Sequence, residues 1–299
     1  MRQTRVAVVG SANMDLVGTA PALPRPGETV LGSDFVMLPG GKGANQAIAA
    51  VRAGASCVLL GAIGSDAFGV TLKARITAAG VDTGQLRVVY GPSGVALVMV
   101  GGEGENAILV SPGANGTFTG LTEGELHAVR EADVLISQLE VPLETVTEAV
   151  VAARAADTRV VLNAAPARPV PAELIAAVDL LVVNETEAVT LTGRGRDDPR
   201  ALLDLVPRAV LTLGGHGAWY VDRDGATVHV PPVKVDAVDS TAAGDAFTAA
   251  LAVAWGEGRE LIEAVHWAAA AGAACVRRLG ASVSLPRRVE IDELYAPPA

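Results

Sequence analysis

Residues 238–247 read VDSTAAGDAF and lead from a valine-rich segment, through small residues, into an apolar helical run that ends at Gly256. Small residues in such a turn let the backbone approach a ligand closely, and the first turn of the following helix directs unpaired N–H groups to the same place. The segment therefore predicts an anion-binding turn. A carboxylate repels an anion, so Asp245 fits a base that takes a proton from the group attacking a bound phosphate. The alternative is an Asp at a helix N-terminus, where the macrodipole alone favours it.

The composition limits the classes of protein to which the chain can belong. Its length of 299 residues fits one large α/β domain, or one domain plus a small insertion, and with 50% apolar and 19% charged residues a sizeable core is expected. The net charge of −10 argues against nucleic acid or an anionic membrane as the main partner. The two cysteines, Cys57 and Cys275, cannot build a disulfide framework. No apolar run reaches the ~18 residues of a membrane-spanning helix. We therefore expect a cytoplasmic protein.

Short β-branched runs alternate with helical stretches along most of the chain. Buried strands are expected at residues 6–10, 56–63, 134–137, 160–163, 180–183 and 209–212, with an edge hairpin at 219–221 and 227–230. Helices are expected after residues 39–46 as far as about Ala53, at 69–79, and near 243–255 and 260–277. This alternation predicts an α/β fold, namely a doubly wound, mostly parallel sheet flanked by helices.

Residues 12–38 and 94–112 do not follow this alternation. They contain period-two strands without partner helices, expected at residues 12–19, 30–38, 95–100 and 106–110, with a glycine-rich turn at 101–104. We expect them to form a small β-sheet lid outside the main domain, which would comprise residues 1–11, 39–93 and 113–299. A sheet of this size leaves one face and its edges uncovered, so a homodimer through the lid is predicted.

Polar or glycine-rich segments follow the carboxyl ends of the predicted strands, where open α/β sheets bind ligands. Asn13 and Asp15, an amide and a carboxylate two residues apart, can grip vicinal hydroxyls of a sugar, and Glu140 adds a third acceptor at the same rim. Asn184 and Glu187 stand three residues apart at a helix start and can hold a hydrated Mg²⁺ or a phosphate. The alternatives are a polar turn for the first pair and an ordinary N-cap for the second.

Two glycine-rich segments complete this set. Residues 212–217 (TLGGHG) end a strand with glycines that suit a nucleotide ribose or phosphate. Residues 41–46 (GKGANQ) nearly match the dinucleotide fingerprint, but Gln46 stands where the third glycine belongs, so an NAD site is not expected. A glycine pair at a helix N-terminus with Asn45 just inside remains. An ordinary helix start is the alternative.

In combination, these segments resemble the ribokinase family of sugar kinases. The matching segments are residues 10–15 (GSANMD), 40–46 (GGKGANQ), 184–187 (NETE), 212–214 (TLG) and 239–245 (DSTAAGD), in the family's order over essentially the whole chain. Residues 102–106 and 111–115 resemble the branch that phosphorylates ribose more than the fructokinase or adenosine kinase branches. The resemblance implies ATP-dependent transfer of phosphate to the 5-hydroxyl of D-ribose.

The resemblance also implies roles for individual residues. The sugar hydroxyls would be bound by Asn13, Asp15, Gly41, Lys42, Gly43, Asn45 and Glu140, with Asp245 at the acceptor hydroxyl. The backbone of Ala242, Ala243 and Gly244 would form the anion hole. The residues that would bind Mg·ATP are Asn184, Glu187, Thr212, Gly214, Gly217 and Gly244. The small sheet would act as a lid over the sugar and as a dimer interface.

A monovalent cation beside the anion hole is a further implication of the resemblance. Its ligands, mostly backbone carbonyls, would come from Asp239, Thr241, Cys275, Arg278, Gly280 and Ser284. K⁺ suits such a cage, and the alternative is that the charge of Arg278 fills the site. Two other functions stay open, a kinase for a nucleoside such as adenosine and a sugar-binding protein without catalysis. The polar residue set and an aromatic content of only 3% favour a sugar.

Overall fold

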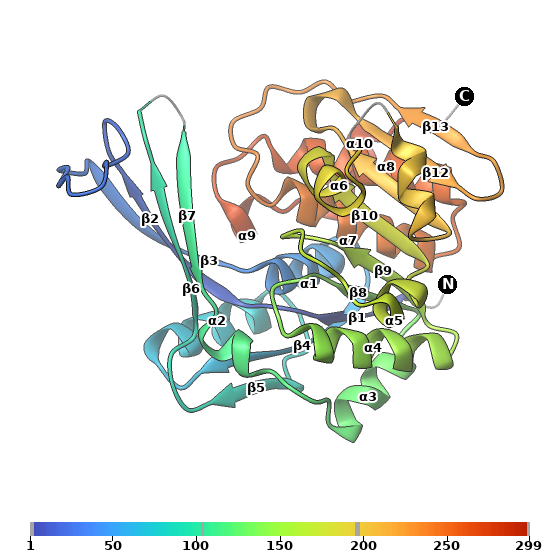
Figure 1. Ribbon diagram of the computed structural model, residues 1–299, viewed down its shortest axis with the longest axis horizontal. Coiled ribbons are helices and arrows are strands. Elements are labelled where there is room, and N and C mark those ends of the chain that lie inside the picture. Colours follow the sequence, from blue (N-terminus) through green and yellow to red (C-terminus); the bar gives the residue numbers. More distant parts are fainter. Residues whose placement is uncertain (1–2, 103–104, 195–197, 298–299) are drawn as a thin grey trace.

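The computed structural model describes residues 3–102, 105–194 and 198–297 of the chain. Its large sheet has nine strands (Figure 1), which are in spatial order β13 (Thr227–Val230), β12 (Ala218–Asp222), β11 (Arg208–Thr212), β10 (Leu180–Asn184), β9 (Arg159–Asn163), β8 (Val134–Ser137), β1 (Arg5–Val9), β4 (Ser56–Gly64) and β5 (Leu86–Val89). The pairs from β5 to β11 are parallel, and β12 and β13 add an antiparallel hairpin at the edge. The predicted sheet and its edge hairpin are confirmed.

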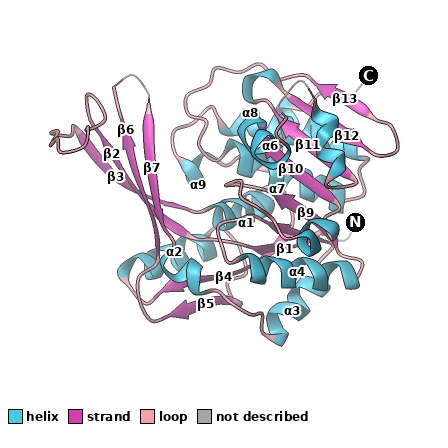
Figure 2. Ribbon diagram, in the orientation of Figure 1, coloured by secondary structure: helices cyan, strands magenta, loops and turns pink. Residues whose placement is uncertain are grey.

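Helices cover both faces of this sheet (Figure 2). One face packs against α1 (Lys42–Arg52), α2 (Ala67–Ala78), α7 (Ala243–Gly256), α8 (Leu261–Cys275) and α10 (Arg288–Leu294). The other packs against α3 (Glu123–Arg130), α4 (Leu143–Ala155), α5 (Ala172–Ala176), α6 (Glu185–Thr192) and the 3₁₀ segment η2 (Pro199–Asp204). In β1, Val6 and Val8 join the first apolar cluster and Ala7 and Val9 the second, as the alternation of side chains in a strand requires.

Four strands form the small sheet, which projects from the main body (Figure 1), in the order β3 (Asp34–Gly40), β2 (Asn13–Thr19), β6 (Gly94–Val100) and β7 (Asn106–Ser111). The strand expected at residues 30–38 instead spans Asp34–Gly40, because it pairs with β2 up to the start of α1. Residues 103 and 104 of the expected glycine-rich turn lie outside the described residues. The separate small sheet is confirmed, whereas the proposed domain boundaries stay a prediction.

Several short elements were not expected from the sequence. The edge strand β5 has four residues, and the helices α9 (Ala281–Ser284) and α10 follow the two helices that were expected to end the domain. Two further 3₁₀ turns are η1 (Gly113–Thr117) and η3 (Gly214–His216). Arg87 interrupts the apolar run of β5, and α9 consists mostly of small residues, so neither shows a recognisable periodic pattern. Among the described residues, no helix has both the length and the apolar character needed to cross a membrane.

Candidate active site

Asp245 lies where two helices from distant parts of the chain meet. Ala242 adopts a left-handed conformation, with φ of 62°, and turns the chain into α7, so Asp245 falls in the first turn of that helix. Its side chain is almost fully buried. Both carboxylate oxygens accept hydrogen bonds from α1, one from Asn45 Nδ2 at 3.0 Å and the other from Gln46 Nε2 at 2.9 Å. The carboxylate is therefore held in one position before any ligand binds.

The surroundings of Asp245 suit a proton acceptor. Burial raises the pKa of its carboxyl, while the positive charge of Lys42 and the amide donors of Gln46 and Asn45 lower it, and the net direction is upward. A carboxyl that is more basic than usual, yet stabilised as an anion by two donors, is suited to general base chemistry. The Oδ1 atom of Asn45 is buried and has no partner within the described residues. A ligand hydroxyl can satisfy it.

Asn13 and Asp15 occupy the start of β2. The Asn13 amide is oriented by Asn115, whose Nδ2 donates to Asn13 Oδ1 at 2.7 Å. Asn115 itself is tied to the backbone N–H and carbonyl of Ala12 at 3.0 and 3.2 Å. With its oxygen engaged, the Asn13 side chain keeps its NH₂ group for a ligand. Asp15 lies two residues further, on the same face of the strand.

Glu140 is held beside the start of α1. Its Oε2 atom accepts hydrogen bonds from Ser11 Oγ at 2.5 Å and from the backbone N–H of Lys42 at 3.1 Å. A side chain at Gly43 would collide with the backbone of Gly10 and Ser11, since an added Cβ would lie 2.5 Å from Ser11 N. Close packing of the helix start on the β1–β2 connection thus requires this glycine.

Four charged side chains interact around this rim. Burial raises the pKa of Asp15 to about 7, with the negative charges of Glu140 and Asp245 acting in the same direction and Lys42 opposing them. For Lys42, burial lowers the pKa, but the surrounding carboxylates outweigh it and the net direction is upward. The rim therefore carries one firmly positive ammonium among three carboxyls. This arrangement can bind a neutral polyol through donors and acceptors together.

The predicted nucleotide residues come from the start of α6 and from the loop after β11. Asn184 and Glu187 form a capping box at the start of α6, with the side chain of each accepting the backbone N–H of the other at 2.8 Å. The N-cap interpretation of this pair is confirmed. Burial raises the pKa of Glu187, and Lys42 and Asp245 are close enough to act on it electrostatically. If these two residues bind a ligand, they would do so while also capping helix α6.

The loop after β11 is shaped by its own packing. Thr212 Oγ1 donates to the carbonyl of Val183 at 3.2 Å. Gly217 has a φ of 88°, and an added Cβ would lie 2.1 Å from the carbonyl oxygen of Val230, so this glycine is required by contact with β13. Gly214 is exposed and has open space around it, which leaves its backbone accessible to a phosphate.

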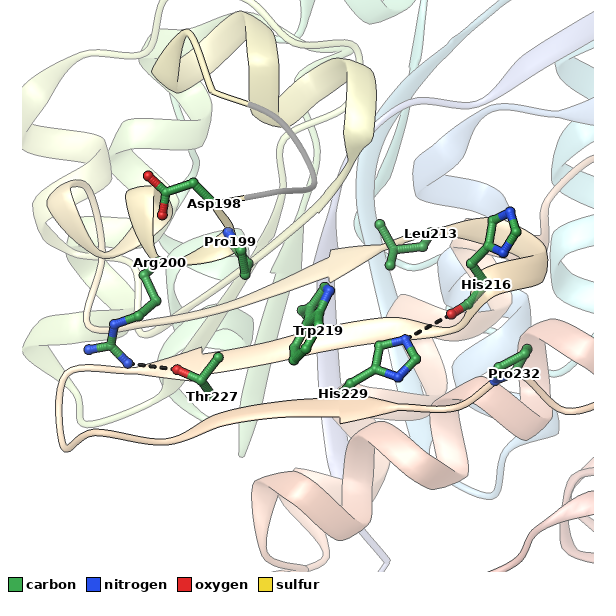
Figure 3. A pocket seen from close by; sticks show the side chains of 9 residues that line it. All are labelled: Asp198, Pro199, Arg200, Leu213, His216, Trp219, Thr227, His229 and Pro232. Atoms are coloured by element: carbon green, nitrogen blue, oxygen red, sulfur yellow. Dashed lines mark hydrogen bonds between the residues drawn. The ribbon is translucent and has the colours of Figure 1, made fainter.

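A cavity of about 910 Å³ borders this loop (Figure 3). It lies over the β12–β13 hairpin, where the rings of Trp219 and His229 are 4.8 Å apart and His229 Nε2 is 3.0 Å from the carbonyl of His216. None of the residues around Asp245 lines it. It is an open surface groove and not the space between the sugar-side residues and Asp245.

Not all backbone N–H groups of the turn before α7 are free to bind an anion. The backbone N–H of Ala243 already donates to the carbonyl of Ser240 at 3.2 Å. Gly244 is exposed in the first helical turn, whose N–H groups have no intrahelical acceptor. An anion at this turn would therefore rely on Gly244 and Asp245 N–H more than on Ala243.

The residues expected around a monovalent cation are brought together. Gly280 N–H donates to Asp239 Oδ2 at 2.8 Å, and Cys275 Sγ lies 3.7 Å from the Thr241 carbonyl and 3.1 Å from Ser284 Oγ. The guanidinium of Arg278 forms an ion pair with Glu290 of α10 instead of turning into this cluster. This pairing disfavours the alternative in which Arg278 fills the site.

Sequence reasoning did not assign roles to the side chains that hold the site residues in place. Ser11 and Asn115 lie inside or beside segments already singled out, and their hydrogen bonds to Glu140 and Asn13 are visible only in three dimensions. Gln46 was noted for departing from a dinucleotide fingerprint and as part of the matching segment 40–46, but no role was assigned to its side chain. It contacts Asp245, Asn163 and Gln138, which come from three other parts of the chain.

Residues 3–288 match the family described as pfkB family carbohydrate kinase. The chain is 38% identical over 293 residues to the ribokinase of Bacillus subtilis, covering 97% of this chain and 99% of that protein. It is 33% identical over 300 residues to the deoxyribokinase of Salmonella typhi, covering 96% and 97%.

Solved structures agree with these relatives. The ribokinase of Arabidopsis thaliana, complexed with ribose and ATP, matches with a TM-score of 0.92 and 32% identity, over 98% of this chain and 99% of that one. The ribokinase of Cryptococcus neoformans, in complex with ADP, matches with a TM-score of 0.85 and 29% identity over 97% and 99%. The fold and the family expected from the sequence are both confirmed. The chain belongs to the pfkB family of carbohydrate kinases.

Proposed function

We propose that this protein is an enzyme that transfers the γ-phosphate of ATP to the 5-hydroxyl of D-ribose. The observation that carries the proposal is the buried carboxylate of Asp245, fixed by Asn45 and Gln46 beside an Asn45 oxygen that has no partner among the described residues. Similarity to ribokinases over nearly the whole chain supports ribose as the sugar. Cys57 and Cys275, both buried free thiols, fit a reducing compartment such as the cytoplasm.

In this proposal the sugar is gripped by side chains and by the start of α1. Asn13 donates through its NH₂ group, Asp15 and Glu140 accept from hydroxyls, and Lys42 donates to the sugar. Gly41 and Gly43 let the start of α1 pack closely on residues 10–13, beside the residues proposed to bind the sugar. Because these polar groups are largely buried, an analogue that lacks a hydroxyl leaves one of them unpaired, and binding is weakened.

Asp245 positions the 5-hydroxyl and finally takes its proton as the phosphate is transferred. Gly244 and the neighbouring N–H groups of the turn stabilise the transferring phosphate, which carries distributed negative charge in a loose transition state. ATP and its Mg²⁺ would be bound by Asn184, Glu187, Thr212 and Gly214. The partly buried carboxylate of Glu187 fits a hydrated magnesium ion. When bound, Mg²⁺ neutralises phosphate charge.

We further propose K⁺ beside the turn. The side-chain and backbone oxygens of Asp239, Thr241 and Ser284 converge with Cys275 and Gly280 in one cluster. A large, weakly hydrated cation suits such a group of oxygens. Replacing K⁺ with tetramethylammonium at fixed ionic strength should lower kcat with little change in the KM for ribose. Unchanged turnover would mean that no ion is needed.

The small sheet supports the proposal of a homodimer. In its register Leu16 lies opposite Met37 and Leu97, and Leu97 lies opposite Leu109, so these side chains share the face that Asp15 does not occupy. Met37 and Leu109 are exposed by 56% and 62%. A second copy of the sheet can cover this apolar face.

Light scattering at micromolar concentration tests this assembly. Leu109→Glu should shift the mass from dimer to monomer, because it buries a charge in the interface. The matched control is Leu31→Glu, at a residue that is exposed by 89% and lies outside the strands. A wild-type monomer with full activity would remove the dimer proposal.

A substrate panel of ribose, 2-deoxyribose, fructose and adenosine tests the function. We expect ribose to give the highest kcat/KM, with ADP formed only when ATP, Mg²⁺ and sugar are all present. The similarity to a deoxyribokinase makes 2-deoxyribose the main competitor, and a preference for it would shift the substrate within the same reaction. Preference for adenosine would overturn the choice of a sugar. No ADP with any of the four would favour a binding protein without catalysis.

A further inference from the structure

A chain of buried amides runs behind Asp245. Gln138 Nε2 donates to Gln46 Oε1 at 2.6 Å, and Gln46 Nε2 donates both to Asn163 Oδ1 at 3.0 Å and to Asp245 Oδ1 at 2.9 Å. Asn163 Nδ2 in turn donates to the carbonyl of Val182 in β10 at 3.1 Å. Gln46 and Gln138 are fully buried, so neither side chain is placed to contact a substrate.

The polarity of this chain is determined by the backbone. The carbonyl of Val182 can only accept, so the NH₂ group of Asn163 faces it and the Asn163 oxygen faces Gln46. Gln46 must then present its NH₂ group to Asn163 and Asp245, and its oxygen is taken by Gln138. Turning any one amide would place two acceptors or two donors in contact. Each amide is therefore locked in one orientation by its neighbours.

We propose that Gln46 is a positioning residue for the phosphoryl transfer, with Gln138 and Asn163 fixing the direction of its amide. This inference rests on the proposed function, in which Asp245 accepts the proton of the sugar hydroxyl. Gln46 holds Oδ1 of that carboxylate, which leaves Oδ2, the atom contacted by Asn45, on the side of the sugar residues. A buried carboxylate with a second firm contact loses the rotation that would otherwise spoil its alignment with the hydroxyl.

Gln46 also has an electrostatic effect that a purely structural side chain would lack. Burial raises the pKa of Asp245, and the donor of Gln46 is among the groups that lower it again. Removing this donor should raise the pKa further and move the acid-side fall in kcat/KM to higher pH. Gln46 and Asn45 act on Asp245 as hydrogen-bond donors. The ionisable groups whose charges interact with Asp245 are Lys42, Glu140, Asp15, Glu187 and Cys275.

The test is the variant Gln46→Met, which keeps an unbranched side chain and removes the amide. We expect kcat for ribose to fall by roughly 10- to 100-fold, as for misplacement of a catalytic group. The dissociation constant for ribose should stay near the wild-type value, and the acid-side fall in kcat/KM should shift upward in pH. A lower kcat without any shift of the pH profile would overturn the positioning role, as would unchanged kinetics.

A second variant covers the case in which Gln46→Met does not fold. Gln138→Met leaves Gln46 in contact with Asp245 but removes the donor to Gln46 Oε1 that fixes the orientation of the Gln46 amide. We therefore expect a smaller fall in kcat and a smaller shift of the pH profile than for Gln46→Met. A normal kcat and pH profile in this variant would remove the proposed role of Gln138 and of the locked chain. The matched control is Thr145→Val, which deletes a buried hydrogen bond of 2.6 Å to the Phe118 carbonyl that involves none of these amides. It should lower stability and leave the pH profile unchanged.

Failure of this inference can be told apart from failure of the proposed function. If the wild type phosphorylates ribose and Asp245→Asn does not, but Gln46→Met behaves as wild type, only the role of Gln46 is lost. If the wild type turns over no sugar, or Asp245→Asn keeps normal turnover, the proposed function or the role of Asp245 fails first, and the positioning role fails with it.

Discussion

The two sides of the candidate active site are built in different ways. On the sugar side, Asn13, Asn45 and Asp245 are buried and are held by hydrogen bonds between segments about 100 to 200 residues apart in the sequence. On the nucleotide side, Asn184 and Gly214 are exposed, and Asn184 is bonded to Glu187 only three residues away. The sugar side therefore depends on the whole fold, whereas the nucleotide side is assembled locally.

Under the proposed function, this difference predicts how each ligand would be recognised. Fixed, buried side chains discriminate between substrates, because an unmatched donor or acceptor there cannot turn to water. Exposed loops and helix N-termini bind phosphate through backbone groups, which every sequence provides. Substitutions on the sugar side should accordingly have large and specific effects, and those on the nucleotide side smaller ones.

The largest effect is expected for Asp245→Asn, at the centre of the sugar side. The substitution keeps the shape of the side chain and removes the base, so kcat should fall by about 10²- to 10⁴-fold. Binding of ribose should change only modestly, since the amide fills the same space. Steady-state kinetics together with calorimetric titration of ribose separate these two quantities. Near-normal turnover would remove the role of Asp245 and the contrast between the two sides.

A smaller effect is expected for Asp15→Asn. Loss of a hydrogen bond to a charged acceptor corresponds to roughly a 10- to 100-fold higher KM for ribose. Asp15 in the folded protein has a pKa of about 7, so it is mostly ionised above pH 7 and mostly protonated below it. Because the ionised form accepts from the sugar hydroxyls, the KM of the wild type should rise as pH falls through 7. The variant should lose this dependence, and a parallel pH profile in both proteins would argue against the assignment.

The smallest effect is expected for Asn184→Ala on the nucleotide side. Removing one half of the capping box should lower the free energy of unfolding by about 1 kcal/mol. The KM for ATP should rise while the KM for ribose stays unchanged. Denaturant titration and kinetics with each substrate varied in turn measure the three quantities. A rise in the KM for ribose as large as in Asp15→Asn would erase the distinction between the two sides.

Most of the fold was predictable because its elements carry strong patterns. The buried strands are continuous apolar runs, and residues 227–230 were predicted with the bounds that the structure gives. The predicted bounds of the exposed strand β3 were wrong by several residues, because its ends are determined by pairing with β2 and not by its own sequence pattern. β5 and α9 are as short as β13, but Arg87 interrupts the apolar run of β5 and α9 consists mostly of small residues, so neither carries a recognisable pattern.

The candidate site was predictable where chemistry follows a motif. Residues such as Asn45 and Asp245 were identified from their segments, and the structure joins them by a hydrogen bond across the fold. The contacts of Gln46 with Asn163 and Gln138 could not be predicted, because all three are ordinary amides in separate segments. The register of β8 and β9 places Gln138 beside Asn163, and Gln46 reaches both from helix α1.

The short junctions between the small sheet and the main body have a mechanical consequence. Only residues 10–12 separate β1 from β2, only Gly41 separates β3 from α1, and residues 90–93 separate β5 from β6. With a rise of about 3.3 Å per residue, a rotation of about 10° at these junctions would move the far end of β2 by about 4 Å and Asp15 by about 1 Å. Such a rotation would be amplified toward the tip of the sheet and remain small at its base. If the sheet closes over the sugar as proposed, its tip would move to exclude water while the residues at its base stay almost in place.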